Sequence, residues 1–296
     1  MLTSYLSNLI IKGGVAPVFD NPADFDLAPE DVSFRTSDGV TLRGWLFRGT
    51  GRGVIVQSHF GVQCSRCGFT PEGKGMAPLW PEDIRFLAHI RAFVDAGYSV
   101  LAYDTRNHGS SDEAGNGWVS WGPTERHDVI AAVTYIASHP DYVDTPIGLL
   151  SICMGLASTT YAFGEDDGLA TVDNLKAIIG VQPLLYTDFM KNVMGLPGFL
   201  TRWVDERNAE RTGVDLVHTS FLPDVSKVEV PTLLVQNKND PFPDMANVEA
   251  YYDRLPAAKE MLWLDLEPKR AAAYAYLTEH PQFMVDFFAR HLTPDS

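Results

Sequence analysis

The chain is poor in cysteine, has no excess of positive charge and contains no long apolar run. Three cysteines among 296 residues do not make a disulfide framework, and the odd number leaves at least one thiol free. The formal net charge of -15 repels nucleic acids and anionic membrane surfaces. No segment approaches the roughly 20 apolar residues of a spanning helix, and the first residues lack the basic start of a signal peptide. These absences predict a soluble, cytoplasmic protein without nucleic-acid or membrane partners.

Motifs for nucleotides and metals are missing as well. No G-x-G-x-x-G follows a strand and no Walker loop occurs, so a nucleotide cofactor is not expected. Cys64 and Cys67 form a C-x-x-C, but a zinc site needs two further ligands and no second pair follows. We therefore expect no cofactor and no metal. Two interpretations of this pair stay open, a redox site and ordinary loop thiols, and the second is favoured.

The chain does contain a regular alternation of strands and helices. Residues 31–35 and 42–47 alternate around 37–39, which predicts a leading hairpin. Strands are then expected at 54–58, 99–103, 147–150, 177–181, 232–235 and 261–264, with helices at 84–96, 125–138, 156–163, 247–254 and 281–291. This alternation predicts the α/β class, with a mainly parallel eight-stranded sheet covered by helices on both faces. A hydrophobic content of 45% is ample for a single domain over 1–296.

Residues 184–231 interrupt the alternation. Large apolar side chains recur there among Gly and Pro without a strand, namely Phe189, Met190, Met194, Phe199, Leu200 and Trp203. Such a segment over the carboxyl edge of the sheet would form a small helical lid on a binding site. The alternative is a surface excursion with its own small core. Tyr186 is a candidate for binding substrate under this lid, although large aromatic residues more often belong to a core.

The stretch Ser151-Ile152-Cys153-Met154-Gly155 has the pattern of a nucleophile elbow with cysteine as the attacking residue. A buried strand precedes it and a helix is expected after it, and a tight turn between the two needs small neighbours. The N–H groups at the start of that helix would stabilise a thiolate and a nearby oxyanion. The alternative is that Cys153 is an ordinary buried cysteine.

Together with this elbow, the order of elements resembles the α/β-hydrolase fold over nearly the whole chain. Three further motifs carry the resemblance: Ser58-His59-Phe60-Gly61 after the third strand, 104–111 as the family's D-x-R-G-H-G-x-S turn, and Asn239-Asp240-Pro241 after the seventh strand. Asn107 stands where that turn usually has glycine. The cysteine elbow is most similar to the dienelactone hydrolase branch, which uses a Cys-His-Asp triad.

The resemblance assigns roles to four of these positions. It implies that Cys153 is the nucleophile and that the N–H groups of Met154 and Phe60 form the oxyanion hole. It also implies that Asp240 is the acid of the triad. Asp244 is the alternative acid, and Asn-Asp-Pro is in any case a common turn.

The family's histidine is absent from its expected position. It should follow the eighth strand closely, yet residues 264–270 contain none. A serine without a base is nearly inert, whereas a thiol ionises partly near neutral pH. His280 and His59 are the candidates to replace it: a loop over 270–276 would have to bring His280 back, while His59 adjoins the oxyanion motif. Each also has a structural interpretation, His280 as a helix boundary and His59 as a residue that orients its loop.

The sequence therefore predicts a cofactor-independent hydrolase or acyl-transfer enzyme. It would act through Cys153 on an ester, lactone or thioester of a small molecule, with Arg66 as a candidate anchor for a substrate carboxylate. Because the base is missing, two alternatives remain: a lyase, isomerase or cyclase on the same fold, and a non-catalytic ligand-binding protein. The oligomeric state is left open, with a homodimer as one option.

Overall fold

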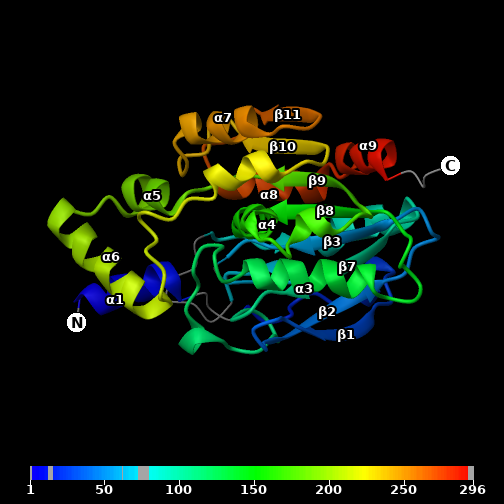
Figure 1. Ribbon diagram of the computed structural model, residues 1–296, viewed down its shortest axis with the longest axis horizontal. Helices are drawn as coiled ribbons and strands as arrows, with labels where there is room; N and C mark the ends of the chain where they lie inside the picture. Colours follow the sequence, from blue (N-terminus) through cyan, green and yellow to red (C-terminus); the bar gives the residue numbers. More distant parts are fainter. Residues whose placement is uncertain (1, 13–15, 62, 73–79, 293–296) are drawn as a thin grey trace.

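The centre of the protein is an eight-stranded sheet in the order β1-β2-β7-β3-β8-β9-β10-β11 (Figure 1). The structure, a computed structural model, describes residues 2–12, 16–61, 63–72 and 80–292. β1 pairs antiparallel with β2, β2 pairs antiparallel with β7, and the other neighbours are parallel. The strands are β1 (Glu30–Arg35), β2 (Thr41–Phe47), β3 (Val54–Ser58), β7 (Ser99–Asp104), β8 (Ile147–Ile152), β9 (Leu175–Val181), β10 (Thr232–Asn237) and β11 (Lys259–Leu264). The predicted hairpin and mainly parallel sheet are confirmed.

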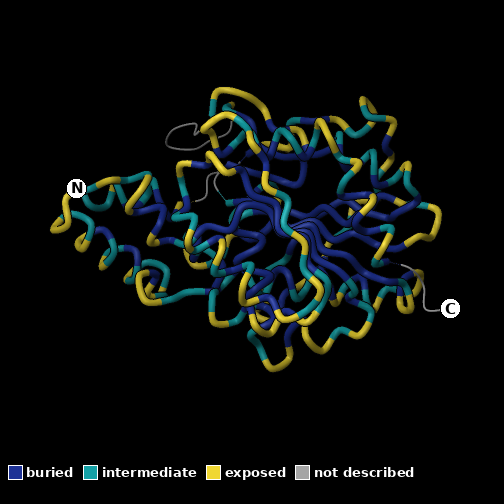
Figure 2. The backbone as a smooth tube through the Cα atoms, turned by 90° about the horizontal axis from the view of Figure 1, so that it is seen from above, coloured by how far each residue is buried: buried dark blue, intermediate teal, exposed yellow. Residues whose placement is uncertain are grey.

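Helices cover both faces of this sheet. One face carries α2 (Leu87–Asp95), α8 (Arg270–Glu279) and α9 (Gln282–His291), and the other carries α3 (Arg126–Ala137), α4 (Met154–Gly164) and α7 (Met245–Arg254). Every residue of β3 and β8 is buried, as expected of strands covered on both sides. Figure 2 shows the strands as the buried centre of the molecule. A sheet of this kind leaves the carboxyl ends of its strands for a ligand site.

A helical extension projects from one end of the sheet (Figure 1). It consists of α1 (Leu2–Ile11), α5 (Tyr186–Phe189), the π-helical turn η4 (Met190–Met194) and α6 (Gly198–Thr212). Its own small core includes Ile10 and Ile11 of α1 and Val204 of α6. Arg211 of α6 donates hydrogen bonds to Ser7 and Asn8 of α1. The N-terminal helix, which the sequence did not predict, is therefore packed against the 184–231 segment.

Two local predictions are wrong. The helix expected from residue 84 begins only at Leu87, because β6 (Ile84–Arg85) joins β4 (Cys64–Ser65) and β5 (Gly68–Phe69) in a small second sheet. Residues 270–276, expected as a loop, form most of α8, since the consecutive alanines 271–273 favour helix. The remaining elements of the described residues are short 3-10 helices, namely η1 (Pro22–Phe25), η2 (Gly115–Gly117), η3 (Leu169–Thr171) and η5 (Leu222–Lys227). Within the described ranges, no helix has the length and apolar character needed to cross a membrane.

Candidate active site

Cys153 lies at the sharp turn between β8 and α4. Its φ of 53° and ψ of -107° are in a region that a residue other than glycine rarely adopts. Gly155 allows α4 to approach β3, because a Cβ there would stand 2.3 Å from the Ser58 carbonyl oxygen. The Cys153 N–H is bonded to the Val181 oxygen at 2.8 Å, which fixes the turn against β9. The backbone therefore has the geometry of a nucleophile elbow.

The two backbone groups expected to hold an oxyanion lie beside this thiol. Phe60, Gly61 and Met154 line the same cavity as Cys153. Met154 opens α4, so its N–H belongs to the first turn, where amides have no partner inside the helix. Gly61 abuts Met154, since a Cβ on it would lie 3.0 Å from the Met154 sulfur. The β3 loop and the start of α4 are thus in direct contact.

Arg270 lies shortly after β11, at the position where the family's histidine was expected and the sequence has none. It follows β11 and begins α8, and its side chain is buried in the cavity wall. One guanidinium nitrogen is 2.5 Å from Asp240 Oδ2, and another donates to the Gln182 carbonyl oxygen at 2.6 Å. Burial alone would lower the pKa of Arg270, but Tyr274, Asp240 and Cys153 raise it above its ordinary value. The guanidinium is therefore a permanent positive charge beside the thiol.

Asp240 is turned toward this arginine. Its other oxygen, Oδ1, accepts the N–H of Phe242 at 3.0 Å, so both carboxylate oxygens have partners. The alternative acid, Asp244, lies at the start of α7 and pairs instead with Lys191 at 2.7 Å on the surface. Of the two carboxylates, Asp240 is the one that the fold joins to the Cys153 cavity.

Tyr274 stands one helical turn after Arg270 and is the second new residue of the site. Both side chains line the same cavity as Cys153 and interact with it electrostatically. The Tyr274 ring stacks on Phe60 with centroids 4.7 Å apart. Burial raises the pKa of Tyr274 well above its ordinary value, although Arg270 opposes that shift. At neutral pH the phenol therefore keeps its proton and is able to donate a hydrogen bond.

The cavity around these groups is small and apolar. It lies at the carboxyl ends of β3, β8, β9, β10 and β11, which supply Phe60, Cys153, Leu184, Phe242 and Arg270. Its remaining described lining is Ile10, Gly61, Trp80, Val119, Trp121, Met154, Phe189 and Tyr274. The volume open to water-sized occupants is about 50 Å³. A substrate larger than its reacting group would require the lining to move.

The two candidate histidines are not brought to the thiol. Nδ1 of His59 lies 2.7 Å from the Phe60 oxygen, and Nε2 accepts the N–H of Thr105 at 3.1 Å. Burial, aided by His108, lowers the pKa of His59 to about 4, so its ring is neutral. His280 is exposed at the far end of α8, about 15 Å along the helix from Arg270 at 1.5 Å per residue. Neither contact pattern supports a role as the base.

The two candidate substrate contacts also have other partners. Arg66 is buried and donates to both oxygens of Asp104, and it does not line the cavity. Tyr186 lies behind the lining, where its hydroxyl is 2.5 Å from Asp205 Oδ1 and its ring meets Trp121 edge to face. Their predicted roles in substrate binding therefore receive no support from these contacts.

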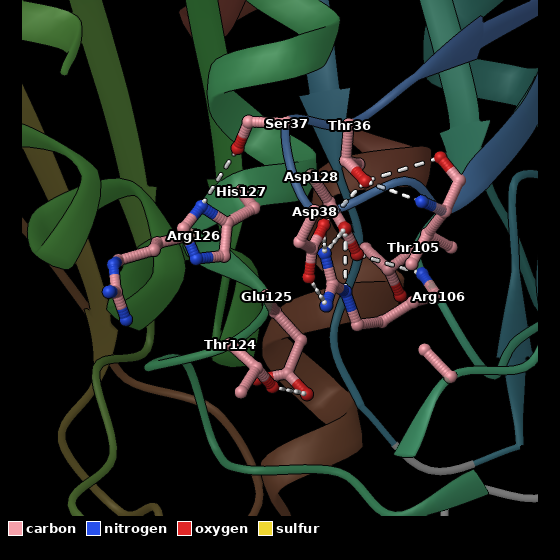
Figure 3. Close-up of polar contacts among 12 residues, drawn as sticks. Thr36, Ser37, Asp38, Thr105, Arg106, Thr124, Glu125, Arg126, His127 and Asp128 are labelled. Atoms are coloured by element: carbon pink, nitrogen blue, oxygen red, sulfur yellow. Dashed lines mark hydrogen bonds and ion pairs between the residues drawn. The ribbon is translucent and has the colours of Figure 1, made fainter. Parts of the chain in front are cut away.

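The turn at 104–111 has a structural role away from the cavity. Figure 3 shows Arg106 held between Asp38 and Asp128, which lie on the leading hairpin and on α3. Burial opposes the charge on Asp38, but hydrogen bonds from Arg106 and Thr36 lower its pKa to about 2. Asn107 has φ of 65°, a conformation that asparagine tolerates better than most residues. This explains how Asn107 replaces the usual glycine.

The C-x-x-C pair, Cys64 and Cys67, does not line the Cys153 cavity. Cys64 and Cys67 are free and fully buried in the small second sheet and its turn. Burial raises the pKa of both thiols, which lowers their reactivity. No group of three or more His, Cys, Asp or Glu that could hold a metal occurs within the described part of the chain. These contacts are those of core thiols.

Sequence reasoning missed Arg270 and Tyr274 as site residues. The signal was present, because Arg270 falls only a few residues after the predicted eighth strand, where the family's histidine should lie. An arginine at a helix start is usually a surface residue, so its type alone did not identify it. The spacing of Arg270 and Tyr274 at i and i+4 places them on one face of a helix.

Several curated proteins are similar to the chain in sequence. It is 29% identical over 200 residues to polyketide transferase af380 of Aspergillus fumigatus, an alignment that covers 66% of this chain and 58% of that protein. It is 29% identical over 159 residues to polyketide transferase grgF of a Penicillium species, covering 54% and 46%. Thiohydrolase aneE of Aspergillus aculeatus is 25% identical over 240 residues, covering 78% and 63%. The chain thus spans about half to three fifths of these relatives, and no protein-family model matches it.

Solved structures match over almost the whole chain. The Pf2001 esterase of Pyrococcus furiosus superposes with a TM-score of 0.68 at 21% identity, covering 94% of this chain and 99% of that one. The α/β hydrolase GrgF of Penicillium sp. sh18 gives 0.60 at 18% identity, covering 90% and 99%. Strand order, the turn at Cys153 and these neighbours agree that the protein has the α/β-hydrolase fold.

Proposed function

We propose that this protein is a cofactor-independent acyl-transfer enzyme that carries its acyl group on Cys153. The observation that carries the proposal is the position of this thiol, at an elbow with positive φ and beside a buried guanidinium. A helix start and a cation both stabilise negative charge that develops next to them. A thiol is intrinsically a stronger nucleophile than a hydroxyl and depends less on an activating base.

The reaction would begin with attack of the Cys153 sulfur on a thioester or ester carbonyl. The new C–S bond turns the carbonyl oxygen into an oxyanion, which the N–H groups of Met154 and Phe60 would receive. Collapse of this intermediate breaks the bond to the leaving group and leaves an acyl thioester on Cys153. Asp240 would hold Arg270 in place rather than act on substrate. The names of the similar proteins, transferases and a thiohydrolase, support acyl chemistry on a small-molecule substrate.

We also propose that residues 184–231, together with α1, form a lid. Ile10, Leu184 and Phe189 come from these segments and line the cavity. Because the enclosed space is small, entry of a substrate would require this part of the lining to open. The cytoplasmic location and the homodimer stay predictions.

Intact-mass measurement after incubation with a small acyl thioester tests the proposed function. We expect one acyl group per chain, lost in Cys153→Ala and kept in Cys64→Ser, which removes a buried thiol outside the site. Cys153→Ser should also fail to acylate, because a serine hydroxyl without a base is a poor nucleophile. An unmodified wild-type chain that still binds the thioester would instead select a non-catalytic binding protein. Turnover that is unchanged in Cys153→Ala would select a different reaction on this fold.

A further inference from the structure

Among the described residues that line the cavity, there are groups that can donate a proton and none placed to accept one. Of the described residues lining the cavity, Cys153, Arg270 and Tyr274 have side chains that ionise. Arg270 and Tyr274 both keep their protons at neutral pH, because the pKa of each is raised. Both stabilise an anion beside them. Neither can take a proton from an attacking water or alcohol.

The carboxylate that could have served as a base is enclosed. Asp240 is 4% exposed, and its oxygens are engaged by the Arg270 guanidinium and the Phe242 N–H. In a triad with histidine, the imidazole stands between acid and nucleophile and carries the proton. Here a guanidinium stands at that point, and it cannot be deprotonated in a protein. The acid–base connection of the triad is therefore replaced by a fixed charge.

This arrangement suits a reaction in which no proton has to move. When Cys153 attacks a thioester, a thiolate attacks and a thiolate leaves. Transfer of the acyl group to a second thiolate reverses the same steps: its sulfur bonds to the carbonyl carbon, the bond to Cys153 breaks, and the Cys153 thiolate is restored. Thiols have a pKa of about 8.5, so about a tenth is ionised near pH 7.5. Water, with a pKa of about 15.7, must lose a proton during attack.

The cavity wall adds to this discrimination. Besides the three ionisable groups, the described lining consists of aromatic and aliphatic side chains and Gly61. A water molecule needs two to four polar partners to be held in such a place. Water activation is therefore disfavoured by the apolar lining and by the absence of a base among the described lining residues.

We propose that the acyl acceptor of this protein is a thiol, so that it exchanges acyl groups between thiols and hydrolyses them slowly. This inference rests on the proposed acylation of Cys153. It names the class of the second substrate, a thiol, and gives the reason that water is a poor acyl acceptor.

Acceptor competition on the full-length acylated protein tests the inference. The acyl-enzyme is made with a small acyl thioester, separated from excess donor, and given N-acetylcysteamine, its alcohol analogue N-acetylethanolamine, or buffer alone. We expect the thiol to remove the acyl group at least about 100-fold faster than the alcohol or buffer, since the pKa of a thiol lies about seven units below that of water. The rate should rise with pH as the acceptor ionises, and an acceptor of lower pKa should shift that profile downward. Equal rates with the thiol and with buffer would overturn the inference.

Replacing Arg270 tests the proposed reason for slow hydrolysis, which is that a guanidinium stands where a base would be needed. Arg270→His places an imidazole next to Asp240, and a general base is typically worth about 10²–10⁴ in rate. We expect hydrolysis of the acyl-enzyme to rise at least about tenfold, while Arg270→Lys, which keeps the charge but adds no base, should not show this gain. Folding of both variants is checked by circular dichroism. A folded, acylated Arg270→His without faster hydrolysis would refute the explanation. Failure of the wild type to acylate would instead refute the proposed function.

Discussion

Removing the charge of Asp240 should destabilise the whole protein. The Arg270 side chain is 2% exposed and the Asp240 side chain 0%, so Asp240→Asn leaves a buried guanidinium without its counter-charge. Loss of one partner of a buried pair costs about 3–5 kcal/mol. Because the Gln182 carbonyl still accepts from Arg270, we expect the lower end, about 3 kcal/mol. At about 2–4 °C per kcal/mol for a large domain, Tm should fall by roughly 6–12 °C.

Thermal unfolding followed by circular dichroism measures this shift. Asp244→Asn is the matched control, because Asp244 pairs with Lys191 while their side chains are 47% and 66% exposed. An exposed pair is worth about 0–1 kcal/mol, so the control should melt close to the wild type. The double variant Asp240→Leu with Arg270→Met should recover much of the loss, since it removes both buried charges. The reasoning is refuted if Asp240→Asn melts with the control.

Three further predictions concern pH, the elbow and the helical extension. The pKa of His59 is lowered from 6.5 to about 4 by burial and His108. The contribution of this ring to the free energy of unfolding is therefore full above pH 6.5 and is lost as the pH falls toward 4. At about 1.4 kcal/mol per pKa unit, wild type should lose about 3 kcal/mol relative to His59→Gln in urea titrations over that window. Gly155→Ala forces a Cβ against the β3 backbone; it should cost about 1–3 kcal/mol or more and slow alkylation of Cys153 by iodoacetamide. Arg211→Ala removes the hydrogen bonds from α6 to α1; it should speed both proteolysis of α1 and that alkylation, with little change in Tm.

Each of these has a control or a contrary outcome. If the unfolding free energies of wild type and His59→Gln stay parallel from pH 7 to 4, the buried ring is not the cause of the acid sensitivity. Gly198→Ala in α6 adds a Cβ with no atom within 4 Å and should be neutral, which separates crowding from glycine loss. Arg202→Ala removes an exposed pair within α6; an equal increase in Cys153 alkylation there would argue against a specific role for the bonds to α1.

Local patterns in the sequence were enough to predict the sheet and the elbow. The apolar runs that become β3 and β8 are buried on both faces, and such runs are recognisable without tertiary context. The small residues around Cys153 predicted a tight turn, and the backbone there has the expected positive φ. Asp240 was predicted from a motif after the seventh strand, and its own turn is local. Each of these features depends on residues close to one another in the chain.

The composition of the site was decided only by the tertiary structure. Arg270 is 117 positions from Cys153 and 30 from Asp240, and only the crossing of α8 over the end of the sheet brings the three together. The same holds for α1, whose Ile10 closes a cavity built from strands far along the chain. Motifs and periodicity extend over short stretches of the chain, so the sequence was enough to show that no histidine follows the eighth strand. It did not show that a buried arginine replaces it, because burial and ion pairing follow from contacts between distant elements.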